Sequence, residues 1–259
     1  MTQKHDAKQA LFTALTAHAG DVKNESVLSA VESLVETNPT NSPVNWELLQ
    51  GNWLLINAPN FPDRQLEFKP RYIYTLGRLT FNAFEPSGLL IEIERVTQPI
   101  FPTERDNEFT HDIIVEFKTI DPDIPELKGF IKNLAVCTFK DETTLEVKFT
   151  GGELMPLNIR DNEKMAIWLS IFGQKSTPFS LNIKEKIGSL VVKWMFGVGK
   201  ASPIDLQTGK TTFAIAKSPT GILEILYLDD ELRITRGKSE SILISQRLID
   251  RPDLESDSF

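Results

Sequence analysis

The strongest constraint on the fold lies near the C-terminal end, where three short strand-like segments follow one another with turns between them. Residues 221–228 form an apolar run that reads as a buried strand. Asp229 and Asp230 follow it, and aspartate forms turns readily and strands poorly. Gly237-Lys238 can make a second turn into residues 241–247, where Ile242 alternates with polar neighbours. The pattern predicts a three-stranded antiparallel meander.

Alternation in the middle strand of this meander places an arginine on an apolar face. Arg236 shares a face with two apolar residues, and the other face carries Glu231, Arg233 and Thr235. Gly51-Asn52-Trp53 opens the first candidate strand, and a cation laid over such a tryptophan closes lipocalin-like barrels. A guanidinium stacks on an aromatic ring and can also hydrogen-bond backbone carbonyls at the closed end. We therefore expect Gly51, Trp53 and Arg236 to close one end of a barrel.

The chain after Gly51 has the spacing of an antiparallel β-protein. Strand-like segments separated by Gly, Pro and Asp recur about every ten residues, which indicates a sandwich or a barrel. They are residues 53–57, 71–76, 79–84, 89–96, 113–118, 131–139 and 144–149. These are enough strands to close a barrel of about eight, a size that can hold one small ligand. Residues 163–173 fit either a short helix or a strand.

Two helices are expected ahead of the barrel. Residues 7–17 form the weaker one, and residues 26–36 carry an apolar stripe at helical spacing. Asn24 suits the N-cap of the second helix, and Asn38-Pro39 ends it. The predicted organisation is a helical segment and linker over residues 1–45, a mainly β barrel domain over residues 46–249, and a disordered acidic tail over residues 250–259.

Composition excludes several classes of protein. The net charge of −8 argues against a general nucleic-acid-binding surface and against electrostatic binding to anionic lipid. The apolar runs are too short to span a bilayer, and residues 1–17 lack the apolar core of a secretory signal. A single cysteine, Cys137, excludes an internal disulfide, and it is expected to be a small buried hydrophobe.

The residue types needed for catalysis or metal binding do not converge in the sequence. Three histidines, His5, His18 and His111, are isolated from one another. His111 could act as a base, but a surface histidine at a strand edge is the expectation. No spacing suits zinc, no glycine-rich nucleotide loop is present, and residues 121–126 resemble a calcium loop only in charge. No catalytic residue, metal site or cofactor is predicted.

The chain resembles the plastid-lipid-associated proteins, or fibrillins, of chloroplasts and cyanobacteria. Three blocks carry the resemblance: the helical residues 7–17 and 26–36 running through Asn38-Pro39 into 48–55, the Tyr-Leu-Asp-Asp-Glu-Leu-Arg-Ile-Thr-Arg-Gly block at 227–237, and the closing strand at 241–247. The chain departs from the family at Ile56-Asn57-Ala58, where Tyr-Thr-Ser-like residues are usual, and residues 151–212 match no family pattern. The resemblance favours a cyanobacterial protein, cytoplasmic or peripheral on the thylakoid, over a mature plastid one.

The resemblance implies a lipocalin-like barrel that binds or organises hydrophobic molecules at photosynthetic membranes without catalysis. Lipids, prenyl quinones and carotenoids are the expected ligands, sequestered in an apolar cavity with polar groups at its mouth. Candidate lining residues are Tyr72, Tyr74, Phe81 and Phe149. Asp229 is expected to pair with Arg233 at the mouth, and the alternative is a charged hairpin turn.

Other readings remain open. Residues 183–196 are either ordinary core and edge strand or a lip in which Trp194, Met195 and Phe196 meet a membrane beside lysines. The same barrel could be a calycin-type enzyme such as a bilin chromophore lyase, or a filled structural scaffold at the membrane. The sequence leaves the ligand and the oligomeric state undetermined.

Overall fold

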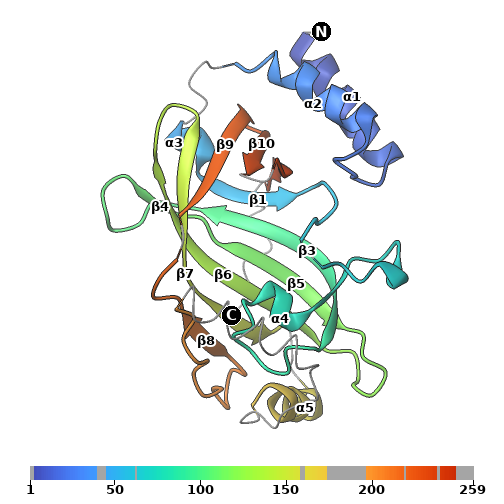
Figure 1. Ribbon diagram of the computed structural model, residues 1–259, viewed down its shortest axis with the longest axis vertical. Coiled ribbons are helices and arrows are strands. Elements are labelled where there is room, and N and C mark those ends of the chain that lie inside the picture. Colours follow the sequence, from blue (N-terminus) through green and yellow to red (C-terminus); the bar gives the residue numbers. More distant parts are fainter. Residues whose placement is uncertain are drawn as a thin grey trace.

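The chain forms a closed antiparallel barrel with helices at both ends and along one side (Figure 1). The structure, a computed structural model, describes residues 3–39, 45–61, 63–157, 161–173, 197–218, 220–237 and 240–248. Eight of the described strands form a ring in the order β6-β5-β3-β1-β11-β10-β9-β7, and pairing between β6 and β7 closes it. The expectation of a mainly β, lipocalin-like barrel with N-terminal helices is confirmed.

The elements follow one another along the chain with most of the helix at the N-terminal end. Their bounds are α1 Gln3–Ala17, α2 Glu25–Val35, α3 Trp46–Leu49, β1 Gly51–Leu55, η1 Leu66–Phe68, β2 Ile73–Thr75, α4 Leu76–Leu79, β3 Leu90–Ile100, β4 Glu108–Thr110, β5 Ile113–Thr119, β6 Lys128–Phe139, β7 Thr144–Pro156, α5 Asn162–Phe172, β8 Thr211–Ala214, β9 Gly221–Leu228, β10 Leu232–Gly237 and β11 Ile242–Arg247. The short strands β2, β4 and β8 extend the ring by pairing with β3, β6 and β7.

The predicted C-terminal meander is confirmed as β9, β10 and β11, paired antiparallel in sequence order. Its first turn forms because the Asp229 carboxylate accepts the backbone N–H groups of Glu231 (3.0 Å) and Leu232 (2.9 Å). Side-chain bonding of this kind to the backbone two or three residues on is the reason aspartate favours turns. A bulge shifts the register of β9 against β10 between Ile234 and Thr235.

One of the other expected strands is absent, and one segment that the sequence left open is a helix. Residues 79–84 are not a strand: α4 ends at Leu79, and Phe81 and Asn82 have positive φ angles of 52° and 55°. Apolar residues there serve a compact turn against the core rather than an extended chain. Residues 163–173, which the sequence left open, are the helix α5, and the Asp161 side chain caps its first turn by accepting the Glu163 N–H.

The two N-terminal helices lie side by side against the outside of the barrel (Figure 1). The predicted N-cap of α2 is confirmed, since the Asn24 side chain accepts the Ser26 N–H. The apolar stripe of α2 and two leucines of α1 pack on the outward side chains of β9, β10 and β11. That cluster includes Leu11, Val27, Val31, Leu34, Tyr227, Leu232, Ile234 and Ile244. The outer face of the meander is therefore a second core.

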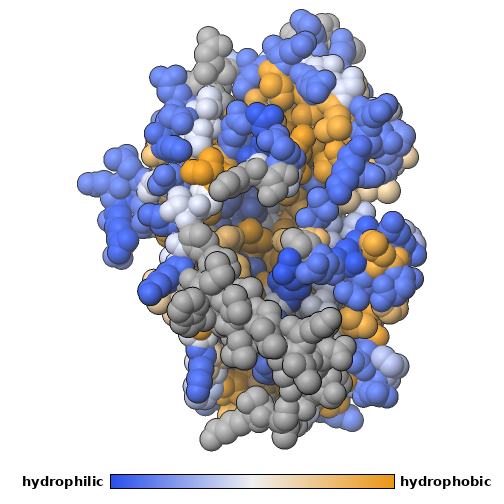
Figure 2. Space-filling model, viewed as in Figure 1, coloured by the Kyte–Doolittle hydropathy of each residue, from blue (hydrophilic) through white to orange (hydrophobic). Residues whose placement is uncertain are grey.

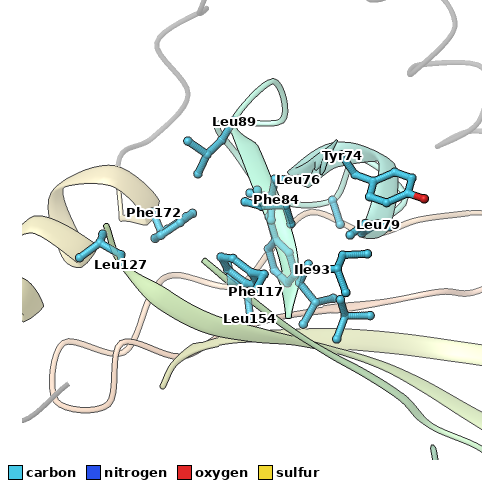
Figure 3. Close-up of a cluster of buried hydrophobic side chains, with 14 of the residues drawn as sticks. Tyr74, Leu76, Leu79, Phe84, Leu89, Ile93, Phe117, Leu127, Leu154 and Phe172 are labelled. Atoms are coloured by element: carbon cyan, nitrogen blue, oxygen red, sulfur yellow. The ribbon is translucent and has the colours of Figure 1, made fainter. Parts of the chain in front are cut away.

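Helices also cover the two ends of the barrel. At one end lies α3, whose Trp46 ring stacks between Phe109 and Phe139. At the other end lie α4 and α5, and the largest apolar cluster gathers there (Figure 3). In it, Phe172 from α5 and Leu79 from α4 approach Phe117 of β5 and Leu154 of β7 (Figure 3). The barrel wall thus separates an outer core under the helix pair from an interior that is covered at both ends.

Candidate functional site

The end of the barrel under α3 is closed by an arginine on a tryptophan, but the arginine is not Arg236. Trp53 is fully buried, and the guanidinium of Arg247 lies 4.3 Å from its ring centroid. Arg247 also donates to the carbonyl oxygens of Leu48, Gln50 and Asp230. Arg247 is the direct cross-strand partner of Trp53, which is why it reaches the ring.

Gly51 makes room for this closure. It has a φ of +128°, and a Cβ at this position would lie 2.5 Å from Arg247 Nη1. Any other side chain would therefore push the guanidinium away from the carbonyl oxygens that hold it. Gly51 and Trp53 thus lie at the closure as expected.

The expectation for Arg236 is wrong. Its guanidinium pairs with the Glu224 carboxylate (2.7 Å) and lies 3.6 Å from the Glu240 carboxylate, and its side chain is 39% exposed. Glu224 is its cross-strand neighbour on β9, so the strand register gives Arg236 a partner on the barrel surface. It makes no contribution to the closure of the barrel end.

Asp229 lies outside the barrel wall and anchors α1. Its carboxylate accepts from the Tyr227 hydroxyl (2.6 Å) and pairs with Lys4 and Lys8 of α1, each at 2.7 Å. Burial opposes ionisation, yet the hydrogen bonds from Lys4, Lys8 and Tyr227 hold the pKa of the Asp229 carboxyl well below its usual range. The expected pair of Asp229 with Arg233 is therefore wrong, and Asp229 serves the docking of the helix.

Arg233 points the opposite way, into the barrel. It is 1% exposed, its Nη2 donates to the Gln98 side-chain oxygen, and its guanidinium lies 5.0 Å from the Trp53 ring centroid. Its Nε and Nη1 have no hydrogen-bond partner, and within the described ranges Arg233 has no ion pair. Burial lowers the pKa of its guanidinium to about 9, which leaves it charged at neutral pH.

His111 lies near Arg233 and is also buried, so the expectation of a surface histidine is wrong. It follows β4, is 3% exposed, and neither ring nitrogen has a hydrogen-bond partner. Burial, with the charge of Arg233, lowers the pKa of His111 to about 3, so the imidazole is neutral. Cys137 is buried and free as expected, and burial raises the pKa of its thiol to about 12.

A groove of about 460 Å³ separates α1 from the barrel wall. One side comes from α1 and the turn after it, and the floor comes from β1, β3 and the chain that leaves β1. The lining residues are Phe12, Leu15, Thr16, Ala19, Gly20, Leu55, Ile56, Asn57, Ala58, Pro59, Tyr72, Ile93, Glu94, Arg95, Val96 and Gln246. Hydrophobic residues show at the surface where the helix pair meets the barrel (Figure 2). The lining mixes apolar side chains with the polar or charged Thr16, Asn57, Glu94, Arg95 and Gln246.

The floor of this groove coincides with a break in the barrel wall. Pairing of β1 with β3 ends at Leu54 opposite Thr97. Beyond that point Ile93 N–H donates to the Tyr72 carbonyl (2.9 Å) instead. The next residues, Leu55 and Val96, line the groove, and both belong to or pack against the interior apolar cluster. The groove therefore lies directly over residues of the barrel interior.

Two hydrogen bonds hold the chain that forms this rim. The buried Asn57 side chain accepts the Ile244 N–H (2.7 Å), and the Ala58 N–H donates to the Gly20 carbonyl (2.9 Å). A Cβ at Gly20, whose φ is +72°, would lie 2.6 Å from the Ala58 nitrogen. The close approach of α1 to the rim therefore depends on glycine. This is the segment at which the sequence departs from the family pattern.

The four aromatic residues expected to line one cavity are distributed over different places. Tyr72 lines the groove, with Arg64 over its ring at 4.1 Å. Tyr74 is fully buried, and its hydroxyl donates to the Pro59 carbonyl (3.0 Å). Phe81 and Phe149 contact each other with ring centroids 5.4 Å apart. The expected membrane lip of Trp194, Met195 and Phe196 lies outside the described residues, as does the tail after residue 248.

Sequence reasoning named Arg233 but missed its partner Gln98 and the groove beside α1. Gln98 could have been recognised from the sequence, because it is a polar residue on the inward face of an alternating strand. The groove depends on how α1 docks, and local periodicity carries no such information.

Within the described ranges, no group of three or more His, Cys, Asp or Glu side chains could hold a metal ion. No described helix is long and apolar enough to cross a bilayer.

The chain matches a known protein family. The model of the PAP_fibrillin family matches residues 6–246, which run from the first turns of α1 to the penultimate residue of β11. The family is one of structural proteins associated with plastid lipids. No curated protein and no solved structure gives a significant match.

Proposed function

The chain belongs to the PAP_fibrillin family, and we propose that it binds a hydrophobic molecule in the groove between α1 and the barrel wall. The ligand class is a lipid, prenyl quinone or carotenoid, and the place of action is the surface of a photosynthetic membrane. The role is sequestration or organisation, without catalysis.

The single observation that carries the proposal is the groove itself. Its volume of about 460 Å³ falls in the range of small-molecule sites, about 300–1,000 Å³. Such sites combine apolar walls with placed polar groups, and this groove has aliphatic and aromatic side chains together with polar and charged ones. The polar and charged lining residues are Thr16, Asn57, Glu94, Arg95 and Gln246. Burial of a hydrocarbon there would be driven by about 25 cal/mol for each Å² of apolar surface removed from water.

Docking of α1 gives the groove its outer wall. Lys4 and Lys8 bind Asp229, and Lys8 also binds Glu231 (2.6 Å), so electrostatic contacts fix the helix at its N-terminal half. Its C-terminal end is tied by the Gly20 carbonyl to Ala58. The side of α1 between these two anchors faces the groove with Phe12 and Leu15. Uptake of a ligand would therefore need little rearrangement of the barrel.

A matched pair of substitutions on α1 tests the proposal. Thr16 and Thr13 are both exposed, and each hydroxyl donates to the carbonyl four residues earlier, but only Thr16 lines the groove. Thr16→Trp should fill the groove and weaken binding of decylplastoquinone by about tenfold or more, which is about 1.4 kcal/mol. Thr13→Trp should bind as the parent does. Equilibrium dialysis of delipidated protein gives both affinities.

Two results would count against the proposal. Equal weakening by both substitutions would place the ligand away from the groove or reflect a general loss of helix docking. Failure of the parent protein to bind decylplastoquinone, β-carotene or a neutral lipid would favour a scaffold that acts through protein or membrane contacts.

A further inference from the structure

The interior of the barrel holds a positive charge that nothing in the described part of the chain neutralises. Arg233 is almost completely buried, and its one hydrogen bond to a side chain goes to Gln98, which is neutral. Its contact with the Trp53 ring uses the face of the guanidinium and leaves the edge donors Nε and Nη1 without acceptors. A buried ion without a counter-ion is strongly unfavourable. An anion that fits beside Arg233 would therefore be bound strongly.

A second buried group without a hydrogen-bond partner among the described residues, His111, lies at the same end of the barrel. The His111 ring is buried and neutral, and a neutral imidazole offers one N–H donor and one acceptor. His111 N–H donates to the Ala135 carbonyl, and Ala135 belongs to the same apolar cluster as Trp53, on whose ring Arg233 lies. Arg233 and His111 are therefore two buried groups with unused hydrogen-bonding capacity at the same end of the barrel.

The side chains around these donors indicate what kind of ligand could bind there. Besides Gln98, His111 and the buried Ser245, which is the cross-strand partner of Arg233, this end of the barrel holds an apolar cluster that includes Leu49, Ile100, Phe109, Leu145 and Leu228. A ligand there needs one charged group and an otherwise apolar body. Phosphate monoesters carry nearly two charges at neutral pH. A second cation is not free for them, because Arg247 already donates to three carbonyl groups. A carboxylate, with one charge and two oxygens, matches Arg233 better.

The groove and two residues that contact Arg233, Trp53 and Gln98, occupy neighbouring positions on the same two strands, β1 and β3. Val96 lines the groove, and Gln98 lies two residues further along the same face of β3, about 7 Å away at the rise of a strand. On the facing strand, Leu55 lines the groove and Trp53, the partner of Gln98, contacts Arg233. The pairing of β1 with β3 ends between the Trp53–Gln98 pair and the groove residues Leu55 and Val96, so the barrel wall has its break there. An elongated ligand in the groove could therefore place its head group at Arg233.

We propose that the protein binds a long-chain carboxylic acid, with the carboxylate held by Arg233 and His111 inside the barrel and the hydrocarbon tail in the groove. The inference rests on the function proposed above, because the tail occupies the same groove. It goes beyond that function by naming an acidic lipid as the preferred ligand and two interior side chains as its specificity determinants.

Two ligands with the same chain length test the inference. Palmitate and hexadecanol differ in the charge of the head group, and displacement of the neutral dye Nile red measures both affinities on the unmodified protein. Palmitate should bind at least about tenfold more tightly than hexadecanol. Arg233→Met should lower the affinity for palmitate to about that for hexadecanol and so remove this preference. Arg236→Met, on the same strand but on the surface, should retain the preference.

The outcomes separate the two proposals. Equal affinity of the unmodified protein for palmitate and hexadecanol would overturn the carboxylate site and leave the groove as a hydrophobic site. Failure of both ligands to displace the dye would overturn both proposals. Should Arg233→Met fail to fold, Arg233→Lys keeps the charge but loses the forked donor geometry, and it should reduce the preference without abolishing it. A preference retained in full by both variants would also overturn the assignment.

Discussion

Asp229 and Arg233 lie four residues apart on one hairpin and have opposite environments. Asp229 is on the outer side of the wall, where Tyr227, Lys4, Lys8 and two backbone N–H groups bind its carboxylate. Arg233 is on the inner side, where two of its nitrogen atoms have no partner. Both are almost fully buried, with 3% and 1% of their surface exposed. One charge is fully satisfied by the fold, and the other is not.

The difference separates a structural role from a binding role. Folding alone explains a buried charge whose hydrogen-bonding capacity is filled, because the contacts offset the loss of hydration. A buried charge with free donors is costly to the folded state unless something else occupies those donors. Removal of the two charges should therefore change stability in opposite directions, and the effects below are ordered from the largest to the smallest.

Loss of the Asp229 carboxylate should strongly destabilise the protein. In Asp229→Asn, Lys8 stays almost buried with Glu231 as its remaining counter-ion, and the breaking of a buried pair costs about 3 kcal/mol. Urea denaturation at neutral pH measures the change. Asp230→Asn is the matched control, since Asp230 is exposed and its contact with Arg247 uses the backbone carbonyl. A similar loss in both variants would show that the turn, and not the ion cluster, is responsible.

His111 should make the protein sensitive to mild acid. Its pKa is about 3 in the folded state and about 6.5 in an unfolded chain, so between these values the unfolded state binds one more proton. Stability therefore falls as the pH falls below about 6.5, and this group should contribute a loss of about 2 kcal/mol between pH 7 and pH 5. In His111→Leu, that part of the acid sensitivity should disappear. Denaturation curves at pH 7 and pH 5 for both proteins test it, and parallel losses would contradict the burial of a neutral imidazole.

Replacement of the interior charge should leave the ligand-free protein equally stable or stabilise it. Arg233→Met combined with Gln98→Leu removes the unpaired ion and its one side-chain acceptor together. Exchange of buried ionic groups for apolar ones is often neutral or stabilising, and a gain of about 1–2 kcal/mol is expected. Thermal denaturation of delipidated protein measures it. A large loss of stability would show that Arg233 is required for folding, as Asp229 is, and would remove the contrast between them.

The sequence predicted correctly that an arginine lies over Trp53 at the closed end of the barrel. The arginine that it named, Arg236, was wrong. Gly51, Trp53 and an arginine do meet there, yet strand register pairs Trp53 with Arg247 and pairs Arg236 with Glu224. Alternation assigns residues to faces and leaves open which face is the interior. Here the apolar face of β10 points outward under α1 and α2, so the charge on the less apolar face enters the barrel.

The same limit explains why the binding residues were difficult to predict. Tyr72, Tyr74, Phe81 and Phe149 are all aromatic and close to predicted strands, but only Tyr72 reaches the groove. The predicted strand at 79–84 is instead the end of α4 and an irregular turn, because tertiary packing determines the backbone of short apolar segments. His111, beside a charged residue in the sequence, is buried because β4 pairs with β6 over it.

The sequence by itself determined the elements whose signal is local. The meander and its Asp229 turn, the two N-terminal helices with the Asn24 cap, the burial of Cys137 and the family all follow from alternation, helical spacing, turn chemistry and motif. Only the tertiary structure decided which face of β10 is inside, which arginine closes the barrel, and where α1 leaves a groove over the break between β1 and β3. The reason is physical: register and helix docking depend on contacts between residues far apart in the chain, and local periodicity carries no information about them.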